Sequence, residues 1–128
     1  MKHQIRVIFG DTDQMGVVYY ANYLRYFEAS RAEYLRQLGS SGKHLDELGI
    51  ALPVVEAHCR YRSPAHYDDL LDIELTVSEK RAASMRFTYE ISRDGTLLAE
   101  GYTIHACIDK AGKPRKFPAE FAAILEPA

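Results

Sequence analysis

The sequence lacks the features that mark proteins which bind nucleic acids or span membranes. Lysine and arginine together number 16, against 18 aspartates and glutamates, which gives a formal net charge of −2. Binding to a polyanion depends on clustered cations that release phosphate counterions, so no nucleic-acid partner is expected. No apolar run approaches the length of a membrane span, and the first residues lack the apolar core and cleavage site of a signal peptide. A cytoplasmic location is therefore expected.

The chain is also poor in metal ligands at useful spacings. Cys59 and Cys107 lie in alternating apolar segments rather than in a Cys-x-x-Cys pair, so we expect two small buried hydrophobic side chains rather than a disulfide. His58 and His105 lie on predicted strands without a second metal-type residue nearby, so we expect packed or surface histidines. A Gly-rich phosphate loop, a His-x-x-x-His pair and a nucleophile elbow are missing as well. We expect neither a metal nor a cofactor.

Five segments alternate between apolar and polar residues, as half-buried strands do. They cover residues 4–9, 55–62, 71–78, 85–92 and 97–109. Asp94-Gly95 separates the last two, and this dipeptide is preferred in tight hairpin turns because type I′ geometry needs positive φ at both central residues. The last segment is largely apolar in both alternating sets, which predicts a central strand or cover on both faces.

One long helix is predicted between the first and second strands. From residue 17 to residue 38 apolar residues recur at three- and four-residue steps, Gly39 stands where a helix often ends, and Arg36 adds positive charge to the last turn. Weaker patterns predict a short helix within residues 40–49 and a helical turn over residues 120–125. The predicted core face of the long helix comprises Tyr20, Leu24, Phe27, Tyr34, Leu35 and Leu38.

These elements predict an α+β fold in which a curved five-stranded antiparallel sheet packs against one helix. At 128 residues and 47% hydrophobic composition, residues 1–128 are expected to form a single domain. One helix covers only one face of a five-stranded sheet. The other face, or an edge strand, is therefore expected to meet a second copy of the chain.

The turn between the first strand and the helix carries two carboxylates. Asp11, Thr12 and Asp13 lie between Gly10 and Gly16. Such residues commonly cap the following helix, although one aspartate is enough for that purpose. The alternative is a catalytic role, because a helix N-terminus polarises a carbonyl group and a nearby carboxylate can attack it or activate water.

A longer pattern runs through this turn and the helix. It reads Asp11-Thr12-Asp13-x-x-Gly16-Val17-Val18-Tyr19-Tyr20-Ala21-Asn22-Tyr23-Leu24-x-x-Phe27-Glu28-x-x-Arg31, and it continues through Tyr61, Pro64-Ala65, Tyr67-Asp68-Asp69-Leu70 and Gly112-x-Pro114. The pattern resembles the signature of the 4-hydroxybenzoyl-CoA thioesterase family, which includes acyl-CoA thioesterases linked to Tol–Pal gene clusters. The resemblance implies the hotdog fold, an acyl-CoA substrate, and a homodimer or homotetramer with active sites at subunit interfaces.

The resemblance also implies roles for individual residues. Asp13 matches the catalytic aspartate, which would attack the thioester carbonyl or act as general base for water. The backbone N–H near Tyr20 would donate to the oxyanion, and Asp11 would hold the turn. Gly16, Val17 and Tyr23 would contribute to substrate binding.

This chain departs from the family pattern at Tyr20. Members associated with Tol–Pal clusters carry a histidine seven residues after the catalytic aspartate, whereas Tyr20 resembles the hydroxybenzoyl branch. Tyr20 would line the acyl pocket or orient the thioester, the alternative being a core position on the helix. Aromatic residues on the helix leave open both an aromatic acyl group and ordinary core packing.

A group of cations on the later strands has two interpretations. It comprises Arg60, Arg62, Lys80, Arg81 and Arg86. Arginine suits the phosphates of CoA, and the other interpretation is a solvated polar face.

Two other functions use the same fold. The chain could act on acyl-carrier-protein thioesters or dehydrate 3-hydroxyacyl groups, although hotdog dehydratases rely on a helix histidine that this chain lacks. It could also bind acyl-CoA without catalysis.

Overall fold

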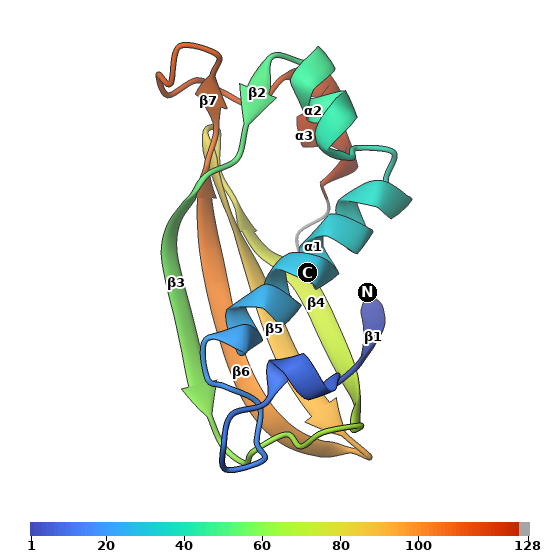
Figure 1. Cartoon of the computed structure of the whole chain (residues 1–128). Helices are drawn as coiled ribbons and strands as arrows, with labels where there is room; N and C mark the ends of the chain where they lie inside the picture. Colours follow the sequence, from blue (N-terminus) through green and yellow to red (C-terminus); the bar gives the residue numbers. More distant parts are fainter. Residues whose placement is uncertain (126–128) are drawn as a thin grey trace.

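The computed structural model describes residues 1–125. Short elements flank one long helix and four long strands (Figure 1). In chain order they are β1 (Lys2–Arg6), the 3-10 helix η1 (Phe9–Asp11), α1 (Asn22–Gln37), α2 (Gly42–Glu47), β2 (Ile50–Ala51), β3 (Val54–Tyr61), β4 (Leu70–Lys80), β5 (Ser84–Arg93), β6 (Thr96–Ala106), β7 (Ile108–Asp109) and α3 (Ala119–Ile124).

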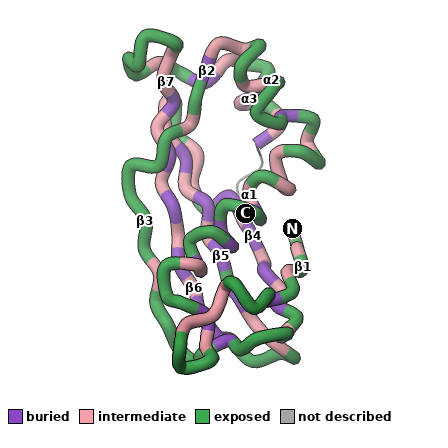
Figure 2. The backbone as a smooth tube through the Cα atoms, in the orientation of Figure 1, coloured by how far each residue is buried: buried purple, intermediate pink, exposed green. Residues whose placement is uncertain are grey.

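The main sheet has five antiparallel strands in the order β1-β4-β5-β6-β3. Asp94 and Gly95 both have positive φ, at 50° and 82°, so the predicted type I′ hairpin between β5 and β6 is confirmed. β6 pairs with a neighbour on each side, as its apolar composition predicts. β3 forms one edge of the sheet, and its residues are exposed along nearly the whole strand (Figure 2).

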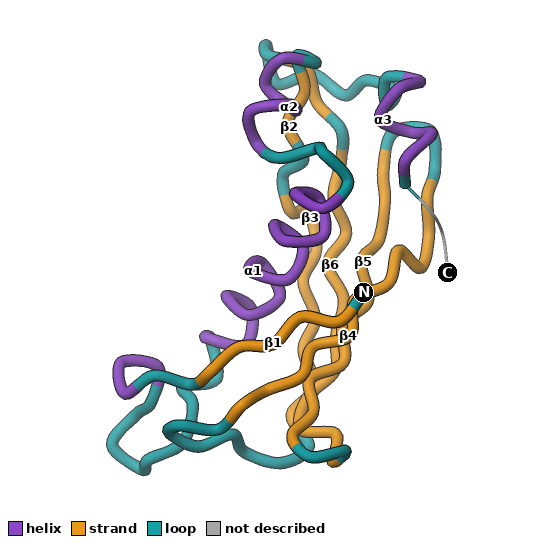
Figure 3. The backbone as a smooth tube through the Cα atoms, turned by 90° about the vertical axis from the view of Figure 1, so that its right-hand side faces the viewer, coloured by secondary structure: helices purple, strands orange, loops and turns teal. Residues whose placement is uncertain are grey.

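Helix α1 lies against one face of the curved sheet, so the predicted α+β arrangement is confirmed (Figures 1 and 3). The helix buries Tyr23, Tyr26, Phe27 and Ser30. The ring of Phe27 stacks on that of Tyr89 in β5, with centroids 4.2 Å apart and planes 6° apart. This contact locks the middle of the helix onto the middle of the sheet.

The predicted start of the helix is wrong by five residues, because α1 begins at Asn22 rather than at Val17. The N–H of Val18 donates to the carbonyl of Ala65 and that of Tyr19 to the carbonyl of Asp11, which holds this segment extended. The predicted core face is correspondingly shifted. Tyr20 is 62% exposed and Leu24 39% exposed.

Two strand boundaries also differ from the prediction. β1 ends at Arg6, and η1 turns Phe9 outward, where it is 78% exposed instead of buried. The predicted strand over residues 97–109 is interrupted at Cys107. β7 continues beyond the interruption and pairs with β2 in a separate two-stranded sheet. The pairing of two short strands is set by distant residues and leaves little pattern in the sequence.

The two short helices are connected to each other and to the main sheet. His44 in α2 lies 3.1 Å from the hydroxyl of Ser40 through one ring nitrogen and 3.1 Å from Glu120 in α3 through the other. Lys80, at the end of β4, donates to the carbonyl groups of Ala122 and Leu125. Both predicted short helices are therefore confirmed, within 40–49 and over the end of the described chain.

Between residues 1 and 125, no helix is both long and apolar enough to span a membrane. Cys107 is buried and Cys59 is half-buried, and both are free thiols.

Candidate active site

Residues 11–19 form a short hairpin ahead of helix α1. The N–H of Asp13 donates to the carbonyl of Val17 at 2.9 Å, and the N–H of Gly16 donates to the carbonyl of Asp13 at 3.0 Å. Gly16 has φ of 81°, a left-handed conformation that glycine adopts without a Cβ clash. A turn followed by a left-handed residue is a common hairpin loop. Asp13 therefore occupies the closing pair of a hairpin.

Neither aspartate of the turn caps helix α1, so the capping interpretation is wrong for this helix. Its N-cap is Ala21, without a side-chain hydrogen bond. Oδ1 of Asp13 accepts the N–H of Met15 at 2.8 Å, which stabilises the turn itself. Within residues 1–125 no protein group donates to Oδ2 of Asp13. One oxygen of this half-buried carboxylate is committed to the turn, and the other is free to react.

Two backbone N–H groups lie unbonded at the start of helix α1. The N–H of Tyr19 donates to Asp11, that of Asn22 to the carbonyl of Tyr19, and those of the next residues to the carbonyls three positions back. No acceptor among the described residues meets the N–H of Tyr20 or Ala21. Free donors at the positive end of a 16-residue helix are suited to bind a developing negative charge.

An aromatic pocket adjoins these donors. Its volume is about 270 Å³, and its lining includes three residues predicted for the site: Tyr20, Tyr23 and Arg62. Tyr61 of β3 completes the wall, and its hydroxyl donates to the carbonyl of Tyr20 at 3.0 Å. Burial, followed by the nearby Cys59 thiol, raises the pKa of Tyr61 to about 12, so this hydroxyl remains a donor at neutral pH. Tyr20 is a pocket residue and not a core residue.

The predicted cation group is not one cluster within a protomer. Arg62 lies beside the aromatic pocket and pairs with Glu100 at 2.6 Å, and Arg60 lies opposite Glu100 in the register of β3 and β6, near His58 and Tyr102. Arg81 follows the last residue of β4 and pairs with Glu79. The eleven residues of β4 separate Arg81 from the end of the strand at Leu70, which is about 36 Å at 3.3 Å per residue. The sequence pattern shows shared strand faces but not this separation along the strand.

The loop behind the hairpin is braced by Asp69. One oxygen of this carboxylate accepts the N–H of His66 at 2.8 Å and the guanidinium of Arg93 at 2.6 Å. Burial alone would raise the pKa of Asp69, but the His66 N–H and the Arg93 charge outweigh burial and hold this pKa below its ordinary value. Because the carbonyl of Asp69 also accepts the N–H of Val7, the brace connects the end of β5 to the segment that enters the site.

Replacing Asp69 by asparagine should lower the free energy of unfolding by about 1.5–3 kcal/mol at pH 7, the usual size for a hydrogen bond to a charged group. A depressed pKa stabilises the fold above the unfolded value of about 3.9, and this contribution disappears as the pH falls through the folded value. Urea unfolding at several pH values between 7 and 3 should show the two proteins converging below about pH 5. A difference of constant size over this range would contradict a role for the carboxylate charge.

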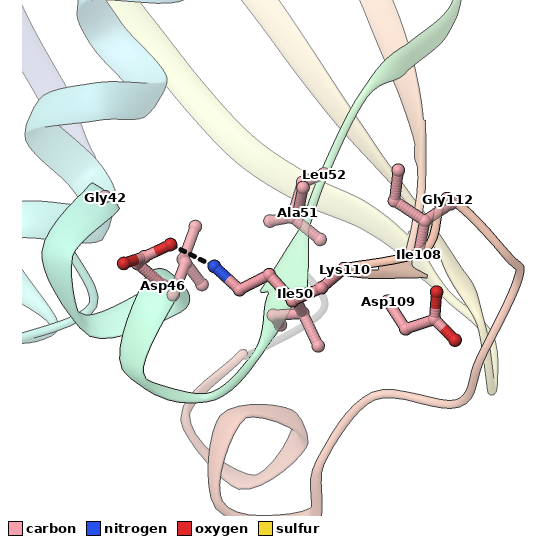
Figure 4. Close-up of a pocket in the computed structure, with 10 residues that line it drawn as sticks. Gly42, Asp46, Ile50, Ala51, Leu52, Ile108, Asp109, Lys110 and Gly112 are labelled. Atoms are coloured by element: carbon pink, nitrogen blue, oxygen red, sulfur yellow. Dashed lines mark hydrogen bonds and ion pairs between the residues drawn. The ribbon is translucent and has the colours of Figure 1, made fainter.

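A larger cavity than the aromatic pocket lies away from this site. A hollow of about 470 Å³ lies between α2, β2 and β7, where Asp46 and Lys110 form an ion pair across its mouth (Figure 4). Asp109 of the same hollow accepts the N–H groups of Ala111 and Lys113, so its carboxylate is used in the turn after β7. Both bonds go to Oδ1 of Asp109, as in Asp13, so what distinguishes Asp13 is the start of helix α1 that follows its hairpin.

The histidines do not gather into a metal site. Buried His105 has partners on both ring nitrogens, the carbonyl of Leu52 and the hydroxyl of Thr103, and exposed His58 stacks on Tyr102. Among residues 1–125, no three His, Cys, Asp or Glu side chains are arranged to hold a metal ion.

Sequence reasoning missed three residues that shape the site: Asn22, Tyr26 and Tyr61. Asn22 and Tyr61 lie within the quoted pattern, but the pattern assigns no contact to either side chain. The position of Tyr26 on the helix predicts only a core aromatic residue. Nothing in the sequence pattern indicates the hydrogen bond from its hydroxyl to Asp11.

Comparisons with known proteins agree with this arrangement. A family described as the Thioesterase-like superfamily matches residues 7–125. Acyl-CoA thioesterase YbgC from Haemophilus influenzae is 39% identical over 121 residues, which are 93% of this chain and 89% of that protein. The crystal structure of a hypothetical protein from Aquifex aeolicus superposes with a TM-score of 0.94 at 30% identity, over 98% of this chain and 99% of that one.

A third relative is an enzyme crystallised with its substrate. A mutant of 4-hydroxybenzoyl CoA thioesterase complexed with 4-hydroxybenzoyl CoA superposes with a TM-score of 0.89 at 26% identity, over 98% of each chain. The resemblance, the expected fold and the expected enzyme class, a thioesterase, are thereby confirmed. The chain belongs to the thioesterase-like superfamily and has its hotdog fold.

Proposed function

We propose that this chain hydrolyses acyl-CoA thioesters to a free acid and CoA, with Asp13 as the reactive carboxylate. The observation that carries the proposal is the pairing of a free carboxylate oxygen on Asp13 with the unbonded N–H groups of Tyr20 and Ala21. Asp13 belongs to the hairpin and the N–H groups belong to the segment that follows it into α1, where Tyr20 also lines the aromatic pocket. A thioester carbonyl in this position would meet a polarising group and a nucleophile or base together.

Asp13 can act in either of two ways. As nucleophile, its Oδ2 attacks the carbonyl carbon, CoA leaves as the thiolate, and water then hydrolyses the mixed anhydride. As general base, Oδ2 takes a proton from the water that attacks the carbonyl. In both routes the tetrahedral oxyanion accepts hydrogen bonds from the helix start, where Tyr20 also contributes its ring to the pocket wall.

The relatives support the substrate class. YbgC of Haemophilus influenzae is named an acyl-CoA thioesterase, and the crystallised mutant of 4-hydroxybenzoyl CoA thioesterase holds an acyl-CoA. Cavity shape supports the same class, because an apolar aromatic pocket accommodates an acyl group and an adjoining arginine accommodates an anionic carrier.

We place the substrate along the hairpin and the aromatic pocket. Gly16 and Val17 form the turn beside Asp13, and Tyr23 lies at the base of the pocket, where its hydroxyl accepts the N–H of Ala65 at 3.1 Å. Arg62 is the cation nearest to this pocket and is the first choice for a CoA phosphate. The position of Arg81 at the far end of β4 means that it could reach CoA only from a second protomer, and Arg60 would act beside Arg62, because both lie near Glu100.

A homodimer or homotetramer is part of the proposal. Eight-residue β3 pairs with β6 on one side only, and it exposes Val54, Val55 and Tyr61 by 45%, 61% and 47%. A long edge strand with apolar side chains is a template for pairing with another chain. Tyr61 also belongs to the aromatic pocket, so a second protomer at this edge would border the pocket.

A hydrolysis screen tests the proposal. The purified protein should release free thiol from at least one member of a panel of short, long and aromatic acyl-CoAs, and aromatic acyl groups are expected to rank well because three tyrosines line the pocket. Sedimentation of the same sample should show a dimer or tetramer. A monomer with full turnover would show that one protomer completes the site.

The alternatives give different results in this screen. If only acyl-carrier-protein thioesters are hydrolysed, the substrate is the thioester of that protein carrier and not of CoA. Saturable CoA binding without thiol release from any substrate would identify a binding module and overturn the proposal. Because the chain has no histidine in α1, dehydration of 3-hydroxyacyl groups is not expected.

A further inference from the structure

The two halves of the proposed site lie on different segments. Asp13 belongs to the hairpin, while the free N–H groups belong to the segment that enters helix α1. The chain between them contains Gly16 in a left-handed conformation and Met15, which is 80% exposed. A loop of this kind does not by itself fix the distance between a carboxylate oxygen and an oxyanion donor.

Asp11 connects these segments through both its carbonyl group and its side chain. The carbonyl oxygen accepts the N–H of Tyr19 at 2.9 Å and the side-chain amide of Asn22 at 2.9 Å. The carboxylate Oδ2 accepts the hydroxyl of Tyr26 at 2.8 Å and the N–H of Ile8 at 3.3 Å. Four donors from three segments therefore converge on one residue, two positions before Asp13.

Two of these donors are side chains of helix α1. Asn22 is the first residue of the helix and Tyr26 lies one turn later, so both project from the same stretch of a rigid element. The ring of Tyr26 is 5% exposed and packs edge-on against Tyr23, with centroids 6.0 Å apart. Packing fixes the ring, and the ring fixes its hydroxyl. The helix therefore holds Asp11 at two points, and through it the strand of the hairpin that leads to Asp13.

We propose that Asn22 and Tyr26 are positioning residues, which hold Asp11 so that Asp13 keeps its place relative to the N–H groups of Tyr20 and Ala21. Tyr19 completes the connection, because its N–H bonds to the same carbonyl immediately before Tyr20. The inference rests on the proposed function. Asn22 and Tyr26 would thus increase the catalytic rate without contacting the substrate.

Tyr26→Phe tests the inference with the smallest change. It removes one hydroxyl and keeps the packed ring, so we expect kcat to fall about 10- to 100-fold, the range for a small misplacement of reacting groups, while KM changes less than about two-fold. Tyr89→Phe is the matched control, because it removes a buried hydroxyl that bonds to Thr103 at 2.7 Å and is remote from the hairpin. The control should lose similar thermal stability and keep its kcat.

A double-mutant cycle separates positioning from general stability. If Tyr26 acts through Asp11, adding Tyr26→Phe to Asp11→Ala should lower kcat by less than about two-fold further. The amide of Asn22 donates to the backbone carbonyl of Asp11 instead, so the effect of Asn22→Ala on kcat should persist in the Asp11→Ala background. If Tyr26→Phe does not fold, Asn22→Ala carries the same measurement of kcat against KM.

Two outcomes would overturn the inference. The first is a Tyr26→Phe protein that loses stability as the Tyr89→Phe control does but keeps its kcat. The second is full additivity in the cycle with Asp11→Ala. Failure of the proposed function gives a different result. Wild-type turnover by an Asp13→Asn protein would show that Asp13 is not the reactive carboxylate, whatever the effect of Tyr26→Phe.

Discussion

Asp13→Asn should lower kcat for acyl-CoA hydrolysis by about 10³-fold, within the range for loss of an essential acid–base or nucleophilic group. The amide can still accept the N–H of Met15 through its oxygen, so the hairpin should keep its shape. What is lost is the negative oxygen that has no protein donor among the described residues. Substrate affinity should change little, because the pocket walls are untouched.

The measurement combines turnover with binding. Thiol release gives kcat, and calorimetric titration with a hydrolysable acyl-CoA gives the affinity of the slow variant. Asp94→Asn is a suitable control, because Asp94 lies in an exposed hairpin turn where asparagine before glycine is also favourable. An Asp13→Asn protein with wild-type turnover would remove Asp13 from the mechanism.

Labelled water then separates the two roles of Asp13. If the carboxylate attacks the thioester carbonyl and water then attacks the Asp13 carbonyl of the mixed anhydride, oxygen from water should enter the Asp13 side chain over repeated turnovers. If Asp13 is a general base, label should appear in the released acid alone. Mass spectrometry of the peptide that contains Asp13 distinguishes these outcomes.

Gly101→Ala should lower the free energy of unfolding by about 3 kcal/mol or more, a substantial part of the stability of a typical domain. A Cβ at position 101 would overlap the carbonyl oxygen of His58 in β3 and lie 2.9 Å from Cε2 of Phe27. The first contact is with backbone, which cannot rotate away. Relief requires β3 to move from β6 or α1 to lift from the sheet.

Urea and thermal unfolding followed by circular dichroism would measure this loss. Gly42→Ala is the matched control, because a Cβ there meets nothing within 4 Å and position 42 is helical. The control should be neutral or slightly stabilising. Equal stability of the two variants would contradict the close approach of β3 and β6. Loss of oligomers in Gly101→Ala alone would be consistent with a displaced edge strand.

The sequence predicts those parts of the fold that depend on neighbouring residues. Strand alternation and the Asp94-Gly95 turn are local signals, and the five-stranded sheet follows from them. The start of the helix cannot be predicted from local signals, because the N–H of Val18 bonds to the carbonyl of Ala65, a residue 47 positions away. Without that contact, the apolar spacing continues smoothly back to Val17.

The site divides in the same way. The roles proposed for Asp13 and for the N–H near Tyr20 come from a pattern of residues in one stretch, and the structure places Asp13 in the hairpin and Tyr20 directly after it. Arg62 and Arg81 have similar positions in the sequence pattern, because each lies at or just after the end of a predicted strand. In the structure the whole length of β4 separates them. The sequence pattern does not identify Tyr26 as a site residue, because its ring has the spacing of a core residue and its proposed role depends on one hydroxyl.

Strand β3 has a consequence for the synthesis of the chain. Its partner β6 follows β3 by about 45 residues, and the intervening β4 and β5 pair with each other and not with β3. At about 5–20 residues per second, the ribosome needs about 2–9 s to translate that interval. During this time β3 has no partner on either edge, with Val54 and Val55 in an extended apolar stretch. A nascent chain is therefore most vulnerable to aggregation before β6 is complete, and chaperone dependence should be greatest for chains stalled between β3 and β6.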